Sequence, residues 1–146
     1  QDKNYLFTYH LTKSAIAGEL LLFEILEDGT LSGGDCICDD IGKARPGGNL
    51  IKCGDRVIRV SQDSTDGYGK GLVFSEVERV FPLYEEKEIM RIGPNDIKGN
   101  WNGKFFGVHT YNRCRDLEVI DLKYRTFSVE EYIAQKRVRK VFMNKY

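Results

Sequence analysis

The chain has 146 residues, of which 41% are hydrophobic and 12% aromatic, so it suits one folded domain and is too apolar for a disordered chain. Lys and Arg together number 22, as do Asp and Glu, so no overall field favours nucleic acid or anionic lipid. The balanced charge predicts no nucleic-acid partner. No apolar run approaches the roughly 20 residues that cross a bilayer, so we also expect no membrane span.

Strands are the main predicted elements. Alternation of polar residues with β-branched and aromatic ones recurs along the chain, and Gly, Asp and Asn separate the alternating runs. This pattern predicts a mainly β fold of antiparallel strands at residues 5–9, 19–25, 49–52, 56–61, 70–78, 88–92, 105–111 and 117–122. Asp28-Gly29 and Gly54-Asp55 lie between apolar runs and predict tight reversals, because Gly and Asp tolerate the positive φ of hairpin turns.

The spacing of strands and turns is that of four-stranded units. Residues 48–92 supply one such unit, which has the size and form of a propeller blade. The segments on either side then form incomplete blades. A sandwich or an open barrel of short strands leaves a similar pattern, so periodicity alone does not choose between these folds.

The C-terminal segment predicts one α-helix. Ser128 is placed to cap its start, and Glu131 occupies the reciprocal position of a capping box. One helical stripe is apolar; its residues are Tyr132, Ile133, Val138, Val141 and Phe142. The basic residues of this segment form either a solvated face, which we favour, or a phosphate-binding one; they are Lys136, Arg137, Arg139 and Lys140.

The cysteines are not spaced like those of a disulfide scaffold, so we expect free or buried thiols at Cys36, Cys38, Cys53 and Cys114. Cys36 and Cys38 project from the same side of an extended segment, and the neighbouring Asp35, Asp39 and Asp40 make a metal site conceivable. The sequence has no second paired set and only 2 histidines, so we expect no metal and no cofactor.

Polar side chains gather where predicted strands meet loops, as in ligand sites built on β scaffolds. The candidate ligand-binding residues are Arg45, Arg59, Gln62, Tyr68, His109 and Asn112. Arg45 precedes Pro46, which holds the backbone extended, and Gly47-Gly48 permits close backbone approach. Its guanidinium either binds a carboxylate, a phosphate or vicinal hydroxyls, or ties adjacent strands through backbone carbonyls.

Asp63 is the candidate catalytic residue. It follows a buried-looking strand beside Gln62, where an amide and a carboxylate can orient sugar hydroxyls, but it can instead cap the turn at residues 64–67. Glycosyl chemistry needs a second carboxylate, roughly 5 Å away for retention or 6.5 to 9.5 Å for inversion. Asp116 and Asp39 are candidates for it only by elimination.

His109 lies within the predicted strand at residues 105–111, and Asn112 lies at its end. A lone His in a strand is often a satisfied structural residue, and the alternative is that both residues bind a polyhydroxylated ligand. Aromatic rings at Tyr68, Tyr111 or Trp101 either stack on a sugar or belong to the core. The sequence contains no nucleophile elbow, phosphate-binding loop, dinucleotide fingerprint or metal-spaced histidines.

Several motifs occur in the order and spacing of a known family. They are Ala44-Arg45-Pro46-Gly47-Gly48, Gln62-Asp63, Tyr68-Gly69, Gly107-Val108-His109-Thr110-Tyr111-Asn112 and Leu117-Glu118-Val119-Ile120-Asp121. From about residue 18 to residue 121, the chain resembles the propeller domain of glucosamine inositolphosphorylceramide transferase-like proteins. That domain is similar to the five-bladed propellers of glycoside hydrolase family 43 type.

The resemblance implies blades whose innermost strands direct Arg45, Gln62-Asp63, His109 and Asn112 into a central, sugar-sized cavity. A full five-bladed propeller needs about twice this length, so residues 1–146 are expected to form one domain, the C-terminal portion of a larger propeller. A carbohydrate ligand is the implied partner. The activity is then glycoside hydrolase-like, or non-catalytic sugar binding, or purely structural assembly. Because cut propellers expose strand edges, we also expect self-association.

Overall fold

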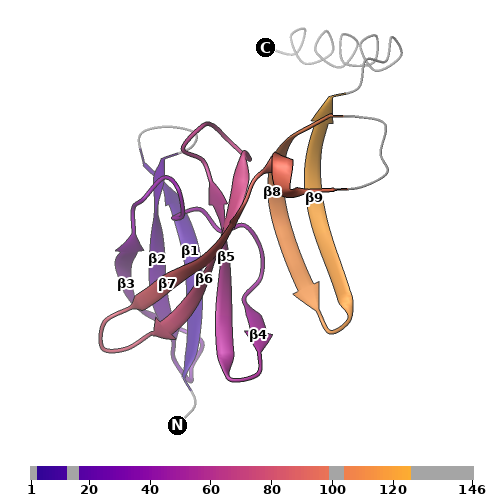
Figure 1. Ribbon diagram of the computed structural model, residues 1–146. Helices are drawn as coiled ribbons and strands as arrows, with labels where there is room; N and C mark the ends of the chain where they lie inside the picture. The colour runs from indigo at the N-terminus through magenta and orange to yellow at the C-terminus, as the bar shows by residue number, and fades with distance from the viewer. Residues whose placement is uncertain (1–2, 13–16, 99–103, 126–146) are drawn as a thin grey trace, which may run out of the picture.

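The computed structural model describes residues 3–12, 17–98 and 104–125, which form three antiparallel sheets (Figure 1). The first sheet has the order β1-β2-β3, with β1 at Asn4–Leu11, β2 at Gly18–Ile25 and β3 at Leu31–Cys38. The second has the order β4-β5-β6-β7, with β4 at Ile51–Cys53, β5 at Arg56–Asp63, β6 at Gly71–Arg79 and β7 at Glu85–Ile92. A short 3-10 helix, η1 (Pro94–Asp96), precedes the third sheet, in which β8 (Lys104–Cys114) pairs with β9 (Leu117–Arg125).

The mainly β, antiparallel prediction is confirmed, and each of the eight predicted strands is present. The predicted four-stranded unit at residues 48–92 is also present, as the sequential meander of the second sheet. Both predicted reversals contain a glycine with positive φ, 80° at Gly29 and 63° at Gly54. The predicted C-terminal helix and Trp101 lie outside the described residues.

The sequence prediction missed β3. Its pairing with β2 is irregular at two places, and Gly33 and Gly34 both have positive φ, 93° and 101°. Such irregularities add residues to one strand and break the strict alternation that reveals a strand in a sequence.

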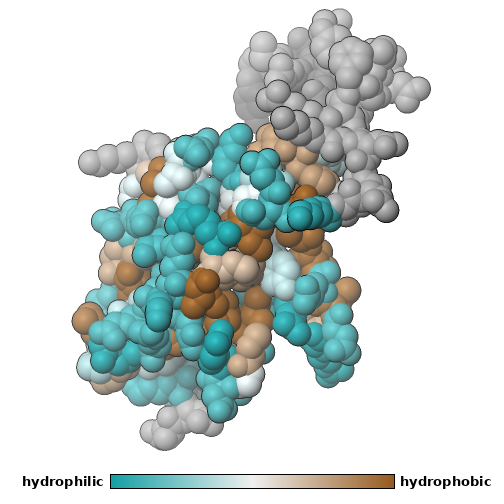
Figure 2. Space-filling model, viewed as in Figure 1, coloured by the Kyte–Doolittle hydropathy of each residue, from teal (hydrophilic) through white to brown (hydrophobic). Residues whose placement is uncertain are grey.

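The second sheet is central because it is covered on both faces. One face joins the third sheet through a buried apolar cluster of Ile51, Ile58, Val60, Leu72, Phe74 and Val108. Burying each such side chain contributes about 1.5 to 3 kcal/mol. Near the other face, Tyr84 meets Phe7 of the first sheet edge-on at 5.8 Å between ring centroids. Figure 2 shows apolar surface where the second and third sheets meet.

The segment 45–49 is the seam between the second and third sheets. Gly47 donates its N–H to the carbonyl of Val60 at 2.9 Å and accepts the N–H of Tyr111 at 2.8 Å. A Cβ at Gly48 would lie 1.8 Å from the carbonyl oxygen of Tyr111, so only glycine permits this approach. Asn49 continues the seam, since its side chain accepts the N–H of Arg113 at 3.1 Å and donates to its carbonyl at 2.9 Å.

Candidate functional site

Side chains from all three sheets converge around Tyr68, in the loop between β5 and β6. We call this group the Tyr68 cluster; its members are Tyr9, Arg45, Tyr68, His109, Asp121 and Lys123. The guanidinium carbon of Arg45 lies 4.7 Å from the ring centroid of Tyr9 and 5.1 Å from that of Tyr68. These are cation–π distances, so Arg45 links β1 to the Tyr68 loop.

A hydrogen-bonded chain joins Tyr68 to β8 and β9. His109 contacts the Tyr68 hydroxyl through Nε2, and its Nδ1 lies 3.0 Å from Oδ2 of Asp121. The rings of Tyr68 and His109 meet edge-on, with centroids 4.7 Å apart. Because an ionised carboxylate only accepts hydrogen bonds, the proton of neutral His109 lies on Nδ1, and Nε2 accepts from Tyr68.

Lys123 completes the cluster from β9. Its Nζ lies 4.3 Å from the Tyr68 ring centroid and donates to the Tyr68 carbonyl at 2.9 Å. Gly69 makes this contact possible, because a Cβ there would lie 2.5 Å from the Lys123 Nζ. Tyr68 remains 43% exposed, and the Asp121 side chain is 57% exposed. The cluster therefore exposes Tyr68 and the Asp121 carboxylate to solvent, with two half-buried cations beside them.

The structure thus brings together Arg45, Tyr68 and His109 of the predicted ligand-binding residues. Sequence reasoning missed three other members of the cluster. Asp121 and Lys123 carried one available signal, because they are charged residues two positions apart and so share a face of β9. For Tyr9, the sequence alone held no signal that distinguishes it from a core aromatic residue.

Arg59 lies elsewhere, in a buried ion pair between β5 and β7. Its Nε donates to Oε2 of Glu86 at 2.7 Å and its Nη2 to Oε1 at 2.6 Å, while Nη1 donates to the carbonyl of Lys43 at 3.0 Å. Burial opposes the charged form of both groups, but their mutual contact outweighs burial. As a result the pKa of Glu86 lies below its ordinary value, and the pKa of Arg59 lies above its own. Burial, followed by the hydrogen bond to Glu86, raises the pKa of Tyr84.

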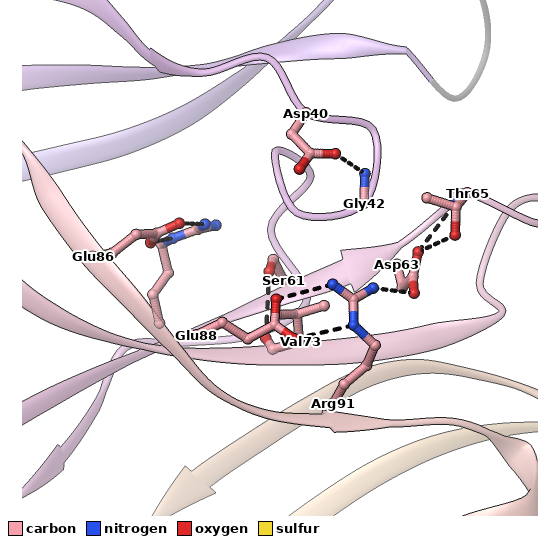
Figure 3. Close-up of polar contacts among 10 residues, drawn as sticks. Asp40, Gly42, Ser61, Asp63, Thr65, Val73, Glu86, Glu88 and Arg91 are labelled. Carbon is pink, nitrogen blue, oxygen red and sulfur yellow. Dashed lines mark hydrogen bonds and ion pairs between the residues drawn. The ribbon is translucent and has the colours of Figure 1, made fainter.

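Asp63 also lies outside the Tyr68 cluster. Its Oδ1 accepts the N–H of Thr65 at 3.1 Å and the hydroxyl of Thr65 at 2.6 Å, the turn contacts that the sequence left open as its alternative role. Figure 3 shows Arg91 between Asp63 and Glu88, with ion pairs to both. Burial would raise the pKa of Asp63, but the hydrogen bonds from Thr65 and Arg91 lower it overall.

A cavity of about 330 Å³ adjoins Asp63. The other carboxylates that line it belong to Asp66 and Asp96, whereas elimination from the sequence had suggested Asp39 and Asp116. The cavity also contains Lys70 and Arg91, so its charges are mixed.

Gln62 and Asn112 help to hold the seam. Gln62 Nε2 donates to the carbonyl of Pro46 at 3.0 Å, and Asn112 Oδ1 accepts the N–H of Asn49 at 2.9 Å. The Gln62 backbone N–H also donates to the carbonyl of Arg45 at 2.8 Å. These contacts fix the backbone that carries Arg45 toward Tyr68.

Another cavity, of about 370 Å³, lies beside the first sheet and the β6–β7 turn. Its lining includes Phe81, Leu83 and Glu24, and Glu24 is already paired with Lys3 at 2.9 Å. We place the candidate site at the Tyr68 cluster instead, because polar groups from separate sheets converge there.

The four cysteines are free thiols. Among the residues that the structure describes, no group of three or more His, Cys, Asp or Glu side chains is placed to hold a metal. Within residues 3–12, 17–98 and 104–125, no helix has the length and apolar character needed to cross a membrane.

No protein-family model matches the sequence, and comparison with curated proteins and with solved structures finds no significant similarity.

Proposed function

We propose that this chain is the C-terminal part of a carbohydrate-associated β-propeller, and that its Tyr68 cluster binds a sugar. The proposed propeller is of the kind found in glucosamine inositolphosphorylceramide transferase-like proteins. A four-stranded meander with a neighbouring sheet on each face supports the blade interpretation. The observation that carries the sugar site is the convergence of polar side chains from three successive sheets on Tyr68.

The chemistry of the cluster suits a polyhydroxylated ligand. Sugar hydroxyls both donate and accept hydrogen bonds, and the cluster offers donors at Arg45 and Lys123 and acceptors at Asp121 and at the Tyr68 hydroxyl oxygen, whose proton is directed at His109. The cation–π contacts and the hydrogen bond to His109 hold these groups in place before a ligand arrives. Such preorganisation lowers the entropic cost of binding.

Calorimetry against a panel of monosaccharides and oligosaccharides, with product analysis, tests this function. We expect binding to be weakened at least about tenfold, or roughly 1.4 kcal/mol, by Tyr68→Ala. Tyr124→Ala is the matched control. Tyr124 is 56% exposed, and because Lys123 faces the cluster, its neighbour Tyr124 lies on the opposite face of β9, away from the cluster. Equal affinities of the two variants, or no binding of any sugar by the parent chain, would refute the proposal.

The geometry supports binding better than carboxylate catalysis, since Asp63 is held by Thr65 and Arg91 outside the cluster. A glycoside hydrolase-like role for Asp63 stays a prediction, and binding without product formation would favour the non-catalytic alternative.

We also propose that copies of this chain associate through strand edges. β9 pairs with β8 on one side, and its other edge is unpaired among the described residues. The strand exposes apolar side chains at Leu117, Val119, Ile120 and Tyr124. Such an edge is a template for another chain. Light scattering should detect a dimer or larger species that Val119→Lys converts to monomer; a monomeric parent chain at working concentration would contradict this.

A further inference from the structure

The contacts of Tyr68 are those of an activated nucleophile. In hydrolases that form covalent intermediates, the nucleophilic hydroxyl is hydrogen-bonded to a base, and a third group orients that base. Here the Tyr68 hydroxyl meets Nε2 of His109, and Nδ1 of His109 lies 3.0 Å from Asp121. Tyr68, His109 and Asp121 therefore occupy the positions of nucleophile, base and orienting carboxylate.

Two cations lie against the Tyr68 ring. Lys123 Nζ lies 4.3 Å, and the Arg45 guanidinium carbon 5.1 Å, from the Tyr68 ring centroid. A phenolate and the oxyanion of a carbonyl under attack both carry charge that fixed cations stabilise. Tyr68 is 43% exposed, so the residue lies at the surface, where a small ester can approach it.

We propose that Tyr68 is a nucleophile that accepts an acyl group from an ester. The phenol oxygen forms a bond to the carbonyl carbon as its proton passes to Nε2 of His109, and Asp121 stabilises the resulting imidazolium. The ester C–O bond then breaks, and the leaving alkoxide takes the proton from His109. Water, with His109 again as the base, then attacks the carbonyl carbon of the acyl-tyrosine. The bond to the Tyr68 oxygen breaks, the carboxylic acid leaves, and the Tyr68 oxygen takes the proton back from His109.

The natural substrate that we infer is an acyl ester of a sugar, and this substrate class rests on the proposed sugar-binding function. The assignment of Tyr68 as the nucleophile does not depend on sugar binding. It can therefore be tested with a substrate that contains no sugar.

The experiment uses the whole chain and p-nitrophenyl acetate at mildly alkaline pH. Nitrophenolate release is followed optically, and acid-quenched samples are digested and analysed by mass spectrometry for acetyl-tyrosine. We expect acetylation at Tyr68 and not at the more exposed Tyr124. His109→Gln, which cannot take up the proton, should slow release by about 100-fold, the usual contribution of a general base.

Tyr68→Phe separates nucleophilic attack by the phenol from direct reaction of the imidazole. It keeps the ring that the cations contact and removes only the oxygen, so release should fall to the rate of the unfolded chain. Release that is unchanged in Tyr68→Phe, or equal in His109→Gln and the parent chain, would overturn the inference. Sugar binding by the same parent chain would then still stand, so the two failures are distinguishable.

Discussion

Replacing Glu86 by Gln tests whether the second sheet depends on its buried ion pair. The side chains of Arg59 and Glu86 are only 4% and 8% exposed, and two hydrogen bonds of 2.7 and 2.6 Å join them. Tyr84 donates a further bond of 2.7 Å to Glu86. Gln has nearly the same shape as Glu but no charge, so the substitution leaves a buried guanidinium without its counterion.

The expected cost follows from these contacts. Breaking a buried pair by removing one partner costs about 3 to 5 kcal/mol. Gln retains one carbonyl oxygen that accepts a bond from Arg59, which recovers about 1 kcal/mol. We therefore expect Glu86→Gln to lower the free energy of unfolding by about 2 to 4 kcal/mol.

Urea unfolding followed by circular dichroism measures this loss, as a lower midpoint at an unchanged m-value. The matched control is Glu85→Gln on the same strand, because the Glu85 side chain is 47% exposed in its pair with Arg79 and should cost below about 1 kcal/mol. The double variant Arg59→Leu/Glu86→Gln should lose less than the sum of the single variants. A Glu86→Gln cost no larger than that of Glu85→Gln would refute the reasoning.

Three further predictions concern the seam, the acidic range and Asp63. Gly48→Ala should destabilise the chain by about 1 to 3 kcal/mol, because the new Cβ meets the carbonyl of Tyr111; Gly93→Ala, with its nearest atom at 3.6 Å, should cost below about 0.5 kcal/mol in the same urea assay. Folding lowers the pKa of Glu86 and Asp63. The two carboxylates therefore stabilise the folded chain fully above their unfolded pKa values of about 4, and this stabilisation is lost as the pH falls through their folded pKa values. The urea midpoint should decrease in acid, and it should decrease less steeply in Glu86→Gln. If Asp63 is catalytic, Asp63→Asn in the full-length protein abolishes glycoside turnover while the circular dichroism spectrum is retained, and unchanged turnover would remove Asp63 from the mechanism.

Most strands could be predicted because their signal is local. A strand with one buried face repeats every two residues, and a tight turn needs Gly, Asp or Asn at particular positions. In β5 the repeat is visible as apolar Ile58 and Val60 alternating with polar Arg59 and Ser61, even though both faces of this strand are buried. The prediction missed β3 because its irregular pairing with β2 breaks the two-residue alternation of side chains.

The candidate site could be predicted only in part. Arg45, Tyr68 and His109 stood out as polar or aromatic residues at strand and loop boundaries, and these three meet. Arg59 and Asp63 had the same appearance in the sequence. Their partners Glu86 and Arg91 lie on β7, more than twenty residues away, and no local pattern indicates such pairs.

The sequence by itself determined every strand except β3, the turns and the four-stranded unit, because these follow from the alternation of side chains along one segment. The tertiary structure decided which polar residues share a surface. Tyr68 gains its partners from β8 and β9, and Arg45 joins it to Tyr9 on β1. Contacts between separate sheets depend on how the apolar faces pack and on the close approach at Gly48 and Gly69, and neither is encoded in the spacing of residues along a single strand.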